Sequence, residues 1–75
     1  MEIKEFIKNF VEQFDEIELA DIQPNTRYKE LEEWSSITAL GLIAMAKTQY
    51  GKTITGLEVR SCNTVEELFN LIASK

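Results

Sequence analysis

The spacing of the apolar residues is the feature that most constrains how this chain can fold. In the first segment these residues recur every three or four positions, and charged or polar residues fill the positions between them. This period matches the turn of an α-helix, whereas a half-buried strand alternates at every second residue. The spacing therefore predicts an amphipathic helix over about residues 2–16. Its apolar stripe consists of Ile3, Phe6, Ile7, Phe10, Val11 and Phe14, and Ile17 continues the series.

A second helix is predicted over residues 36–50, and Gly51 provides a natural C-terminal stop. Its outward face is unusual, because Lys47 is the only ionised side chain between Ser36 and Tyr50. The outward face of a surface helix normally carries several charges. The residues expected to face the core are Ala39, Leu42, Ile43, Ala46 and Tyr50. The opposite face is expected to carry Ile37, Gly41, Ala44 and Thr48, flanked by Leu40, Met45 and Lys47.

The C-terminal third of the chain has two further helical signals. Residues 53–62 fit a loop followed by a short helical turn. Residues 64–73 have the pattern of a final helix, in which Thr64 and Glu67 form a capping box. The apolar stripe of this helix consists of Val65, Leu68, Phe69 and Ile72.

The segment between the first and second helices is a long loop, which Pro24 marks. We expect four apolar residues to hold it to the core, namely Leu19, Ile22, Tyr28 and Leu31. No segment of the sequence has the alternating pattern of a strand. The predicted fold is therefore all-α, a small bundle of three main helices plus one short helix, in one domain over residues 1–75.

Composition narrows the classes of function. A net charge of −5 argues against nonspecific binding to nucleic acid or to a membrane surface. No apolar run approaches the roughly 18–20 residues of a membrane span, so we expect no membrane insertion. The chain has no histidine and one cysteine, Cys62, so we expect neither a metal site nor enzyme activity. The charged start lacks the apolar core of a signal peptide, and we expect a cytoplasmic protein that is a monomer.

Two adjacent serines, Ser35 and Ser36, stand at the entry to the second predicted helix. A serine at this place often caps the helix, because its hydroxyl accepts a hydrogen bond from a free amide of the first turn. Only one of the two can occupy the cap, and neither is followed three residues later by the acidic or amide residue of a capping box. The alternative is that one serine is an attachment point for an anionic group, which a helix N-terminus favours.

The segment Leu31-Glu32-Glu33-Trp34-Ser35-Ser36-Ile37 resembles the L-G-x-D-S-L region of acyl carrier proteins. The likeness extends over essentially the whole chain in the spacing of that family, without a gap. The three-residue motif is weak by itself, but the full-length register makes the combination specific. The matching features are the phenylalanine-rich first helix, the long loop holding Tyr28, the helix from Ile37 to Gly51, then Ile54, Thr64-Val65 and the apolar positions to Ile72.

The resemblance implies that Ser36 carries a 4'-phosphopantetheine arm. In this family a separate phosphopantetheinyl transferase moves the arm from coenzyme A to the serine oxygen, using its own magnesium ion. The thiol at the end of the arm then holds an acyl group as a thioester, on which acyl-loading and acyl-processing enzymes act. We therefore expect a free-standing carrier, for fatty acid or specialised lipid or polyketide synthesis.

The sequence departs from the family pattern in charge. Ser35 replaces the usual aspartate before the modified serine, and the second helix lacks the acidic residues that typically dock on basic partner surfaces. We therefore hypothesise that partners contact a small apolar face rather than a field of carboxylates. Gly41 is expected to belong to this face; an equal alternative is that a glycine is simply tolerated there because the position faces solvent. This face consists of Ile37, Leu40, Gly41 and Ala44.

The register of the family also implies a cleft in which an attached acyl chain can shelter, between the second helix and the segment after Ile54. Cys62 would lie near it and is expected to be a small buried hydrophobe rather than a reactive thiol. Trp34 is expected to pack over the ends of the helices, with direct contact to a partner as the alternative. The candidate lining of the cleft is Ala46, Ile54, Val59, Cys62 and Leu68.

Two other functions remain open at this stage. The first is a carrier for aminoacyl or peptidyl groups, loaded by an adenylating ligase. The second is a non-carrier helical module for protein interaction, in which Ser36 is only a helix cap and the apolar face binds another protein. Attachment of the arm separates both carriers from this module.

Overall fold

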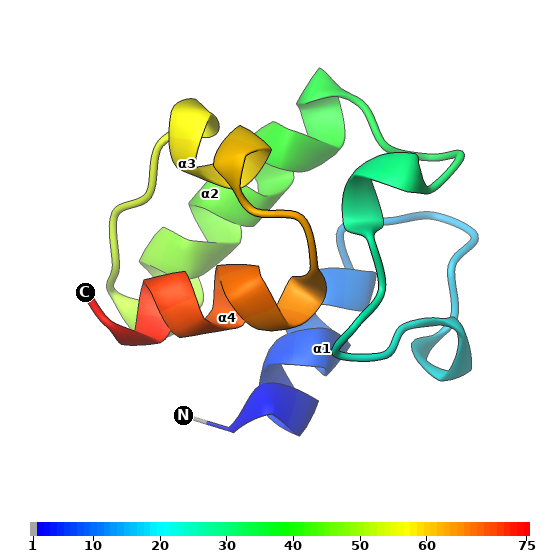
Figure 1. Ribbon diagram of the computed structural model, residues 1–75, viewed down its shortest axis with the longest axis horizontal. Coiled ribbons are helices and arrows are strands. Elements are labelled where there is room, and N and C mark those ends of the chain that lie inside the picture. The colour runs from blue at the N-terminus through cyan, green and yellow to red at the C-terminus, as the bar shows by residue number, and fades with distance from the viewer. Residues whose placement is uncertain (1) are drawn as a thin grey trace.

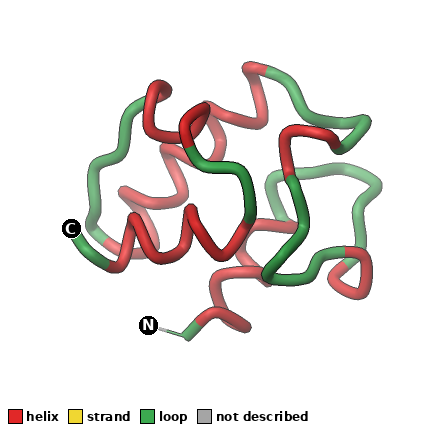
Figure 2. The backbone as a smooth tube through the Cα atoms, viewed as in Figure 1, coloured by secondary structure: helices red, strands yellow, loops and turns green. Residues whose placement is uncertain are grey.

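Helices form where the apolar period coincides with capping residues. The computed structural model describes residues 2–75, and this range contains helices and loops but no strand (Figure 1, Figure 2). The predicted all-α class, with three main helices and one short helix, is confirmed. The helices are α1 (Ile3–Val11), α2 (Ser36–Tyr50), α3 (Gly56–Ser61) and α4 (Val65–Ala73), and two 3-10 turns, η1 (Leu19–Asp21) and η2 (Tyr28–Glu30), interrupt the loop between α1 and α2.

One apolar core joins the four helices. In Figure 1, α3 lies beside α2, and α4 lies beside α1. Phe6 of α1 is fully buried and contacts Phe69 of α4 edge to face, with the ring centres 5.4 Å apart. Within residues 2–75 no polar or charged residue is buried, so burial of apolar surface is the main source of stability. The largest fully buried side chains are Tyr28, Phe6, Phe10, Leu42, Leu68, Ile72, Val59 and Val65.

The first helix is shorter than its apolar pattern predicts. The pattern extends to Phe14, but α1 ends at Val11 and the chain then turns. The backbone amides of Asp15 and Glu16 donate to the two carboxylate oxygens of Glu33, each at 3.0 Å, instead of to helix carbonyls. Phe14 still reaches the core, because the turn returns its side chain to the same apolar face. The prediction of a helix to residue 16 is therefore wrong, and a contact distant in sequence is the reason.

The second helix has the predicted bounds but a slightly different buried face. Leu42 and Ala46 are fully buried, as predicted, whereas Ala39, Ile43 and Tyr50 are only half-buried. Met45, which was expected on the outer side, is buried with 3% exposure. The buried side of α2 is therefore centred nearer Met45 than the sequence pattern indicates. Gly51 ends the helix in the left-handed region, with φ of 67°, where a glycine has no steric cost.

The long loop is held by buried side chains and by its own backbone carbonyls. Ile22 and Tyr28 are buried and Leu31 is half-buried, as predicted. Leu19 is 53% exposed, so its predicted role as an anchor is wrong; it lines an open surface groove beside α1. The loop carbonyls of Thr26 and Pro24 accept hydrogen bonds from two free amides of the first turn of α4, at 3.0 and 2.8 Å. The first turn of α4 thus fixes the middle of the loop.

Tyr28 connects this loop to α3. Its hydroxyl donates to the backbone carbonyl of Val59 and lies 3.1 Å from the carbonyl of Cys62. Its ring packs edge to face on Trp34, with the ring centres 5.0 Å apart. The residues around α3 and those before α2 are therefore positioned by the same side chain.

The shorter helices begin with threonine caps. Thr55 and Glu58 form a reciprocal capping box that starts α3. Thr64 caps α4 by accepting the Glu67 amide at 3.2 Å, as predicted. The Glu67 carboxylate accepts the amide of Asn63 rather than that of Thr64, so the predicted capping box at α4 is only half formed. This carboxylate therefore accepts from the residue before the cap, at 2.8 Å.

Candidate functional site

Ser35 is the N-cap of α2. Its backbone is extended, and its hydroxyl oxygen accepts the Thr38 amide at 3.4 Å. In return the Thr38 hydroxyl oxygen accepts the Ser35 amide at 2.8 Å. The expectation that neither serine has a capping-box partner is therefore wrong, because a threonine hydroxyl takes the place of the usual glutamate. The structure thus gives Ser35 a defined structural role.

Ser36 is the first residue of α2 and its hydroxyl remains free. The side chain is exposed, and it has no hydrogen-bond partner within residues 2–75. Since Ser35 already caps the helix, Ser36 is not needed for capping. Its hydroxyl is therefore accessible to a group from another molecule.

A surface groove of about 340 Å³ begins at Ser36 and runs between α2 and α3. Ala39, Leu40 and Ile43 of α2 form one wall, and Trp34 lies at the serine end. Gly56 and Arg60 of α3 contribute the other wall. The groove is mainly apolar, and Arg60 is the only ionised residue among those that line it.

The residues expected to form a cleft for an acyl chain do not line this groove. Ala46, Ile54, Val59 and Leu68 are buried in the packed core, with exposures of 0–2%. Cys62 is half-buried against the same core rather than buried. The groove beside Ser36 is therefore a different feature, with walls from α2 and α3, and the cleft for an acyl chain stays a prediction.

The surroundings of Cys62 disfavour the ionised form of its thiol. Burial, with the nearby Glu67 carboxylate, raises the pKa of the Cys62 thiol above its usual value, and the Lys29 ammonium opposes this only in part. The thiolate is the reactive form of a cysteine, so a raised pKa lowers reactivity at neutral pH. Cys62 thus packs against the core without being fully buried, and its expected lack of reactivity stays a prediction.

The apolar side chains near Ser36 are strongly exposed. Ile37 is 79% exposed and Leu40 is 64% exposed, and Ala44 on the same helix is also exposed. Leu57 of α3, which the sequence analysis did not single out, is 66% exposed. Its place in a six-residue helix whose inward residue is Val59 is the signal that could have identified it.

Gly41 differs from the other members of the predicted docking face. It is half-buried, because the side chain of Gln13 lies over it. A Cβ atom at this position would come within 2.8 Å of the Gln13 side-chain oxygen. The Gln13 amide also donates to the Asn9 carbonyl at 3.3 Å, which holds the side chain along α1. The alternative of an open, solvent-facing glycine is therefore wrong, because Gln13 packs on this position, whereas contact of Gly41 with a partner stays a prediction.

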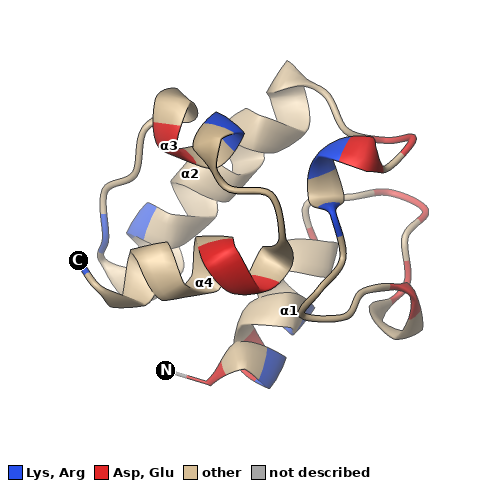
Figure 3. Ribbon diagram, in the orientation of Figure 1, with Lys and Arg blue, Asp and Glu red and all other residues tan. Residues whose placement is uncertain are grey.

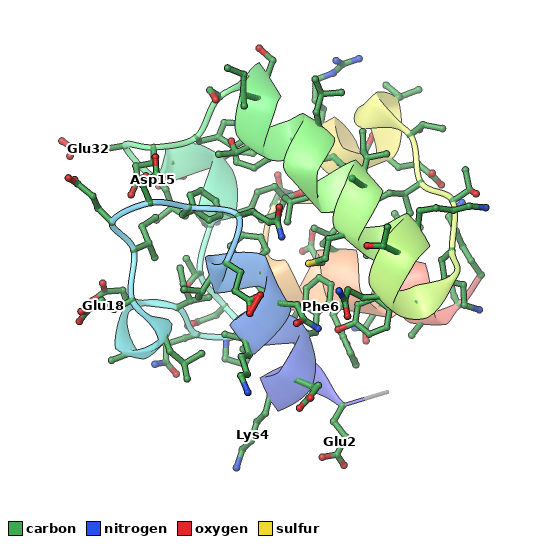
Figure 4. The ribbon with its side chains drawn as sticks, turned by 180° about the vertical axis from the view of Figure 1, so that it is seen from behind. Glu2, Lys4, Phe6, Asp15, Glu18 and Glu32 are labelled. Atoms are coloured by element: carbon green, nitrogen blue, oxygen red, sulfur yellow. The ribbon has the colours of Figure 1, made fainter. Side chains whose placement is uncertain are left out.

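Charge is distributed unevenly around the site. Figure 3 shows acidic residues along the loops that join α1 to α2, whereas α2 is almost free of charged residues. Asp15, Glu18 and Glu32 all lie along one edge of the molecule, on these loops (Figure 4). The groove beside Ser36 is therefore mainly apolar with one ionised residue, Arg60, among those that line it, and no acidic residue lines it.

Among residues 2–75, no group of three or more cysteine, aspartate or glutamate side chains is placed to hold a metal ion. None of the helices in that range combines the length and the apolar character that crossing a bilayer requires. Comparisons with protein-family models, with curated proteins and with solved structures find no match to this chain.

Proposed function

We propose that this chain is a carrier protein that holds acyl groups as thioesters on a 4'-phosphopantetheine arm attached to Ser36. We assign it to fatty acid or specialised lipid or polyketide synthesis in the cytoplasm. Its partners are then a phosphopantetheinyl transferase and the enzymes that load and process the acyl group. The resemblance of residues 31–37 and of the full-length register to acyl carrier proteins suggested this function.

The observation that carries the proposal is the division of roles between the two serines. Ser35 caps α2 through Thr38, and the hydroxyl of Ser36 is exposed without a partner in the part of the chain that the structure describes. A serine that only capped the helix would have its oxygen bonded to an amide of the first turn. The free hydroxyl of Ser36 supports its use as an attachment point.

The surroundings of Ser36 suit such an attachment. The oxygen lies at the end of an open groove, so an attached chain has room beside α2 without displacing core residues. In the attachment step, the oxygen of Ser36 forms a bond to the phosphorus next to pantetheine in coenzyme A. The pyrophosphate bond breaks, adenosine 3',5'-bisphosphate leaves, and the serine proton passes to a base of the transferase. The thiol that the arm supplies is the group that forms thioesters.

No catalytic residue of this chain is required by the proposal. Ser36 is a substrate for the transferase, and the reactions of the acyl group take place in partner enzymes. The apolar surface of Ile37, Leu40 and Ala44 beside Ser36 is available for contact with such partners.

Intact-mass measurement tests the proposal directly. The purified chain is incubated with coenzyme A, Mg²⁺ and a broad-specificity phosphopantetheinyl transferase. We expect the native chain to gain one phosphopantetheine, and we expect no gain on Ser36→Ala. Ser35→Ala serves as the matched control and should still be modified, because it retains the Ser36 oxygen.

Two results would overturn the proposal in different ways. If the native chain gains no mass with competent transferases, the carrier function is wrong. If Ser36→Ala is modified and Ser35→Ala is not, the attachment site is Ser35 instead.

The exposed side chains of Ile37, Leu40 and Leu57 favour one second function, a protein-interaction module without an arm. Large apolar side chains clustered at a surface commonly mark a contact with another protein. This function predicts no mass gain, and it predicts that Leu40→Ser leaves folding intact while it removes binding to the partner.

A further inference from the structure

Arg60 places a positive charge in the groove between α2 and α3, and no acidic side chain within residues 2–75 pairs with it. The other ionised residue of α3, Glu58, pairs with Lys75, with 2.8 Å between its carboxylate oxygen and the lysine nitrogen. The Lys75 ammonium and the Thr55 amide hold the pKa of Glu58 below its usual value, so the carboxylate stays ionised in this pair. Arg60 makes no ion pair within residues 2–75.

A second cation reinforces this charge. The Lys29 ammonium donates to the Arg60 backbone carbonyl at 2.6 Å and lies 3.3 Å from the side-chain oxygen of Asn63. Neither partner of this ammonium is a carboxylate, so its charge also remains. The end of α3 therefore carries two cations, and neither forms an ion pair within residues 2–75.

Arg60 and Ser36 line the same groove from opposite sides. On the α2 wall, Ala39, Leu40 and Ile43 provide no charge and no hydrogen-bonding side chain. A ligand that fits this groove has an anionic group near Ser36 and an apolar segment along α2.

We propose that Arg60 pairs with the phosphodiester of an arm on Ser36 and so holds the arm in the α2–α3 groove. This inference rests on the proposed carrier function. A phosphodiester keeps one negative charge at neutral pH, and the planar guanidinium of arginine donates two parallel hydrogen bonds to phosphate oxygens. The geminal methyl groups of the arm then lie on Ala39, Leu40 and Ile43, and Trp34 closes the serine end of the groove.

The pairing is reversible. Arg60 is exposed, and exposed ion pairs contribute only about 0–1 kcal/mol. The arm therefore exchanges between the groove and solvent, and salt shifts this exchange toward solvent by screening the pair. A partner enzyme can take the arm out of the groove at a small energetic cost.

The test uses the native chain loaded with coenzyme A by a broad-specificity transferase and verified by intact mass. We expect nuclear Overhauser contacts between the geminal methyl protons of the arm and the side chains of Leu40, Ile43 or Trp34 at low salt. Arg60→Gln, loaded in the same way, should lose at least about half of their intensity. The matched control is Arg27→Gln, because Arg27 is exposed, pairs with Glu30 and does not line the groove.

The outcomes separate this inference from the proposed function. A native chain that gains no mass overturns the carrier function itself. A loaded chain whose arm makes no contact with the groove overturns this inference and leaves the carrier function standing. Contacts that are equally strong in loaded Arg60→Gln overturn the role of Arg60.

A salt titration of the loaded native chain provides a measurement that needs no variant. Between about 20 and 500 mM NaCl the Debye length falls several-fold, so we expect the contacts to weaken as the salt concentration rises. Contacts that do not change over this range overturn the ion pair between Arg60 and the arm. This measurement is also possible if the transferase does not modify Arg60→Gln.

Discussion

At the scale of single residues, the two serines before α2 have separate roles although they are chemically identical. Ser35 bonds to Thr38 from both its amide and its hydroxyl, whereas the side chain of Ser36 is free among the described residues. The sequence could place both serines at a helix start but could not choose between them. Local rules expect a glutamate or glutamine in a capping box, and here a threonine hydroxyl does this work.

This division predicts different effects on stability. Ser35→Ala should lower the free energy of unfolding by about 1 kcal/mol, because the Thr38 amide loses its acceptor. Ser36→Ala should change it by less than about 0.5 kcal/mol, as is usual for an exposed surface position. Urea unfolding of both variants beside the native chain measures the difference. Equal losses in the two variants would show that Ser36 also has a capping role.

A second prediction for a single residue concerns Tyr28 and the dependence of stability on pH. Burial, with Cys62 and Glu67 nearby, raises the pKa of the Tyr28 hydroxyl above its ordinary value of 10.0. Above pH 10 the unfolded chain therefore loses a proton that the folded chain retains. The contribution of Tyr28 to the free energy of unfolding therefore has its full value below pH 10. It decreases as the pH rises further, by at most about 1.4 kcal/mol per pH unit for this one group.

Tyr28→Phe separates this contribution from the rest. Without the hydroxyl, the carbonyls of Val59 and Cys62 lose a donor, so we expect a loss of about 1–3 kcal/mol at neutral pH. The decline above pH 10 should become shallower than in the native chain. Some decline should remain, because the pKa of Cys62 is also raised and its thiol contributes in the same direction from about pH 9. Unfolding curves at pH 7, 9, 10 and 11 measure both effects; identical slopes in the two proteins would contradict the assignment to Tyr28.

At the scale of elements, the sequence predicts the existence of each helix better than its end. The bounds of α2 agree with the prediction because a serine pair precedes it and Gly51 follows it. The end of α1 differs from the prediction. The apolar period continues to Phe14, but the amides of Asp15 and Glu16 donate to Glu33. Glu33 lies 18 positions after Asp15 and 17 after Glu16, and a periodic pattern carries no information on a contact at that separation.

The carboxylate of Glu33 therefore has a testable role in fixing the end of α1. Glu33→Ala should lower the free energy of unfolding by about 1 kcal/mol, because two amides lose a charged acceptor at a site that solvent partly reaches. The exchange of the Asp15 and Glu16 amides with deuterium should become faster in this variant. Glu32→Ala is the matched control, since Glu32 is the exposed acidic neighbour and accepts neither amide. Unchanged exchange in Glu33→Ala would show that the turn is held by packing alone.

At the scale of the whole molecule, the class of fold follows from the sequence because apolar period, caps and turn residues agree. The groove at Ser36 could not be predicted in the same way. Its walls come from α2 and α3, two separate helices, and Tyr28 joins the loop before α2 to α3 through a contact distant in sequence. The family register pointed instead to residues that the structure places in the packed core or, for Cys62, half-buried against it, and the cleft that they would form stays a prediction.

The distribution of charge over the molecule predicts how its partners find the surface at Ser36. Residues 36–63 carry Lys47, Lys52 and Arg60 against Glu58, whereas the rest of the chain carries five basic and twelve acidic residues. Electrostatic steering to a basic partner would need acidic residues near the docking surface, and these lie along the α1–α2 loops instead (Figure 3). Contact at Ile37 and Leu40 is then driven mainly by burial of apolar surface, which salt screens very little.

We therefore expect the rate at which a transferase modifies Ser36 to depend weakly on ionic strength. Between about 20 and 200 mM NaCl, kcat/KM should change by less than about threefold, whereas steered associations lose rate steeply over this range. Leu40→Ser should reduce kcat/KM far more than Lys47→Gln, because Leu40 contributes apolar contact and Lys47 contributes only a screened charge. A steep fall of kcat/KM with salt, or a larger effect of Lys47→Gln, would mean that partners bind through the charges of this surface and not through its apolar side chains.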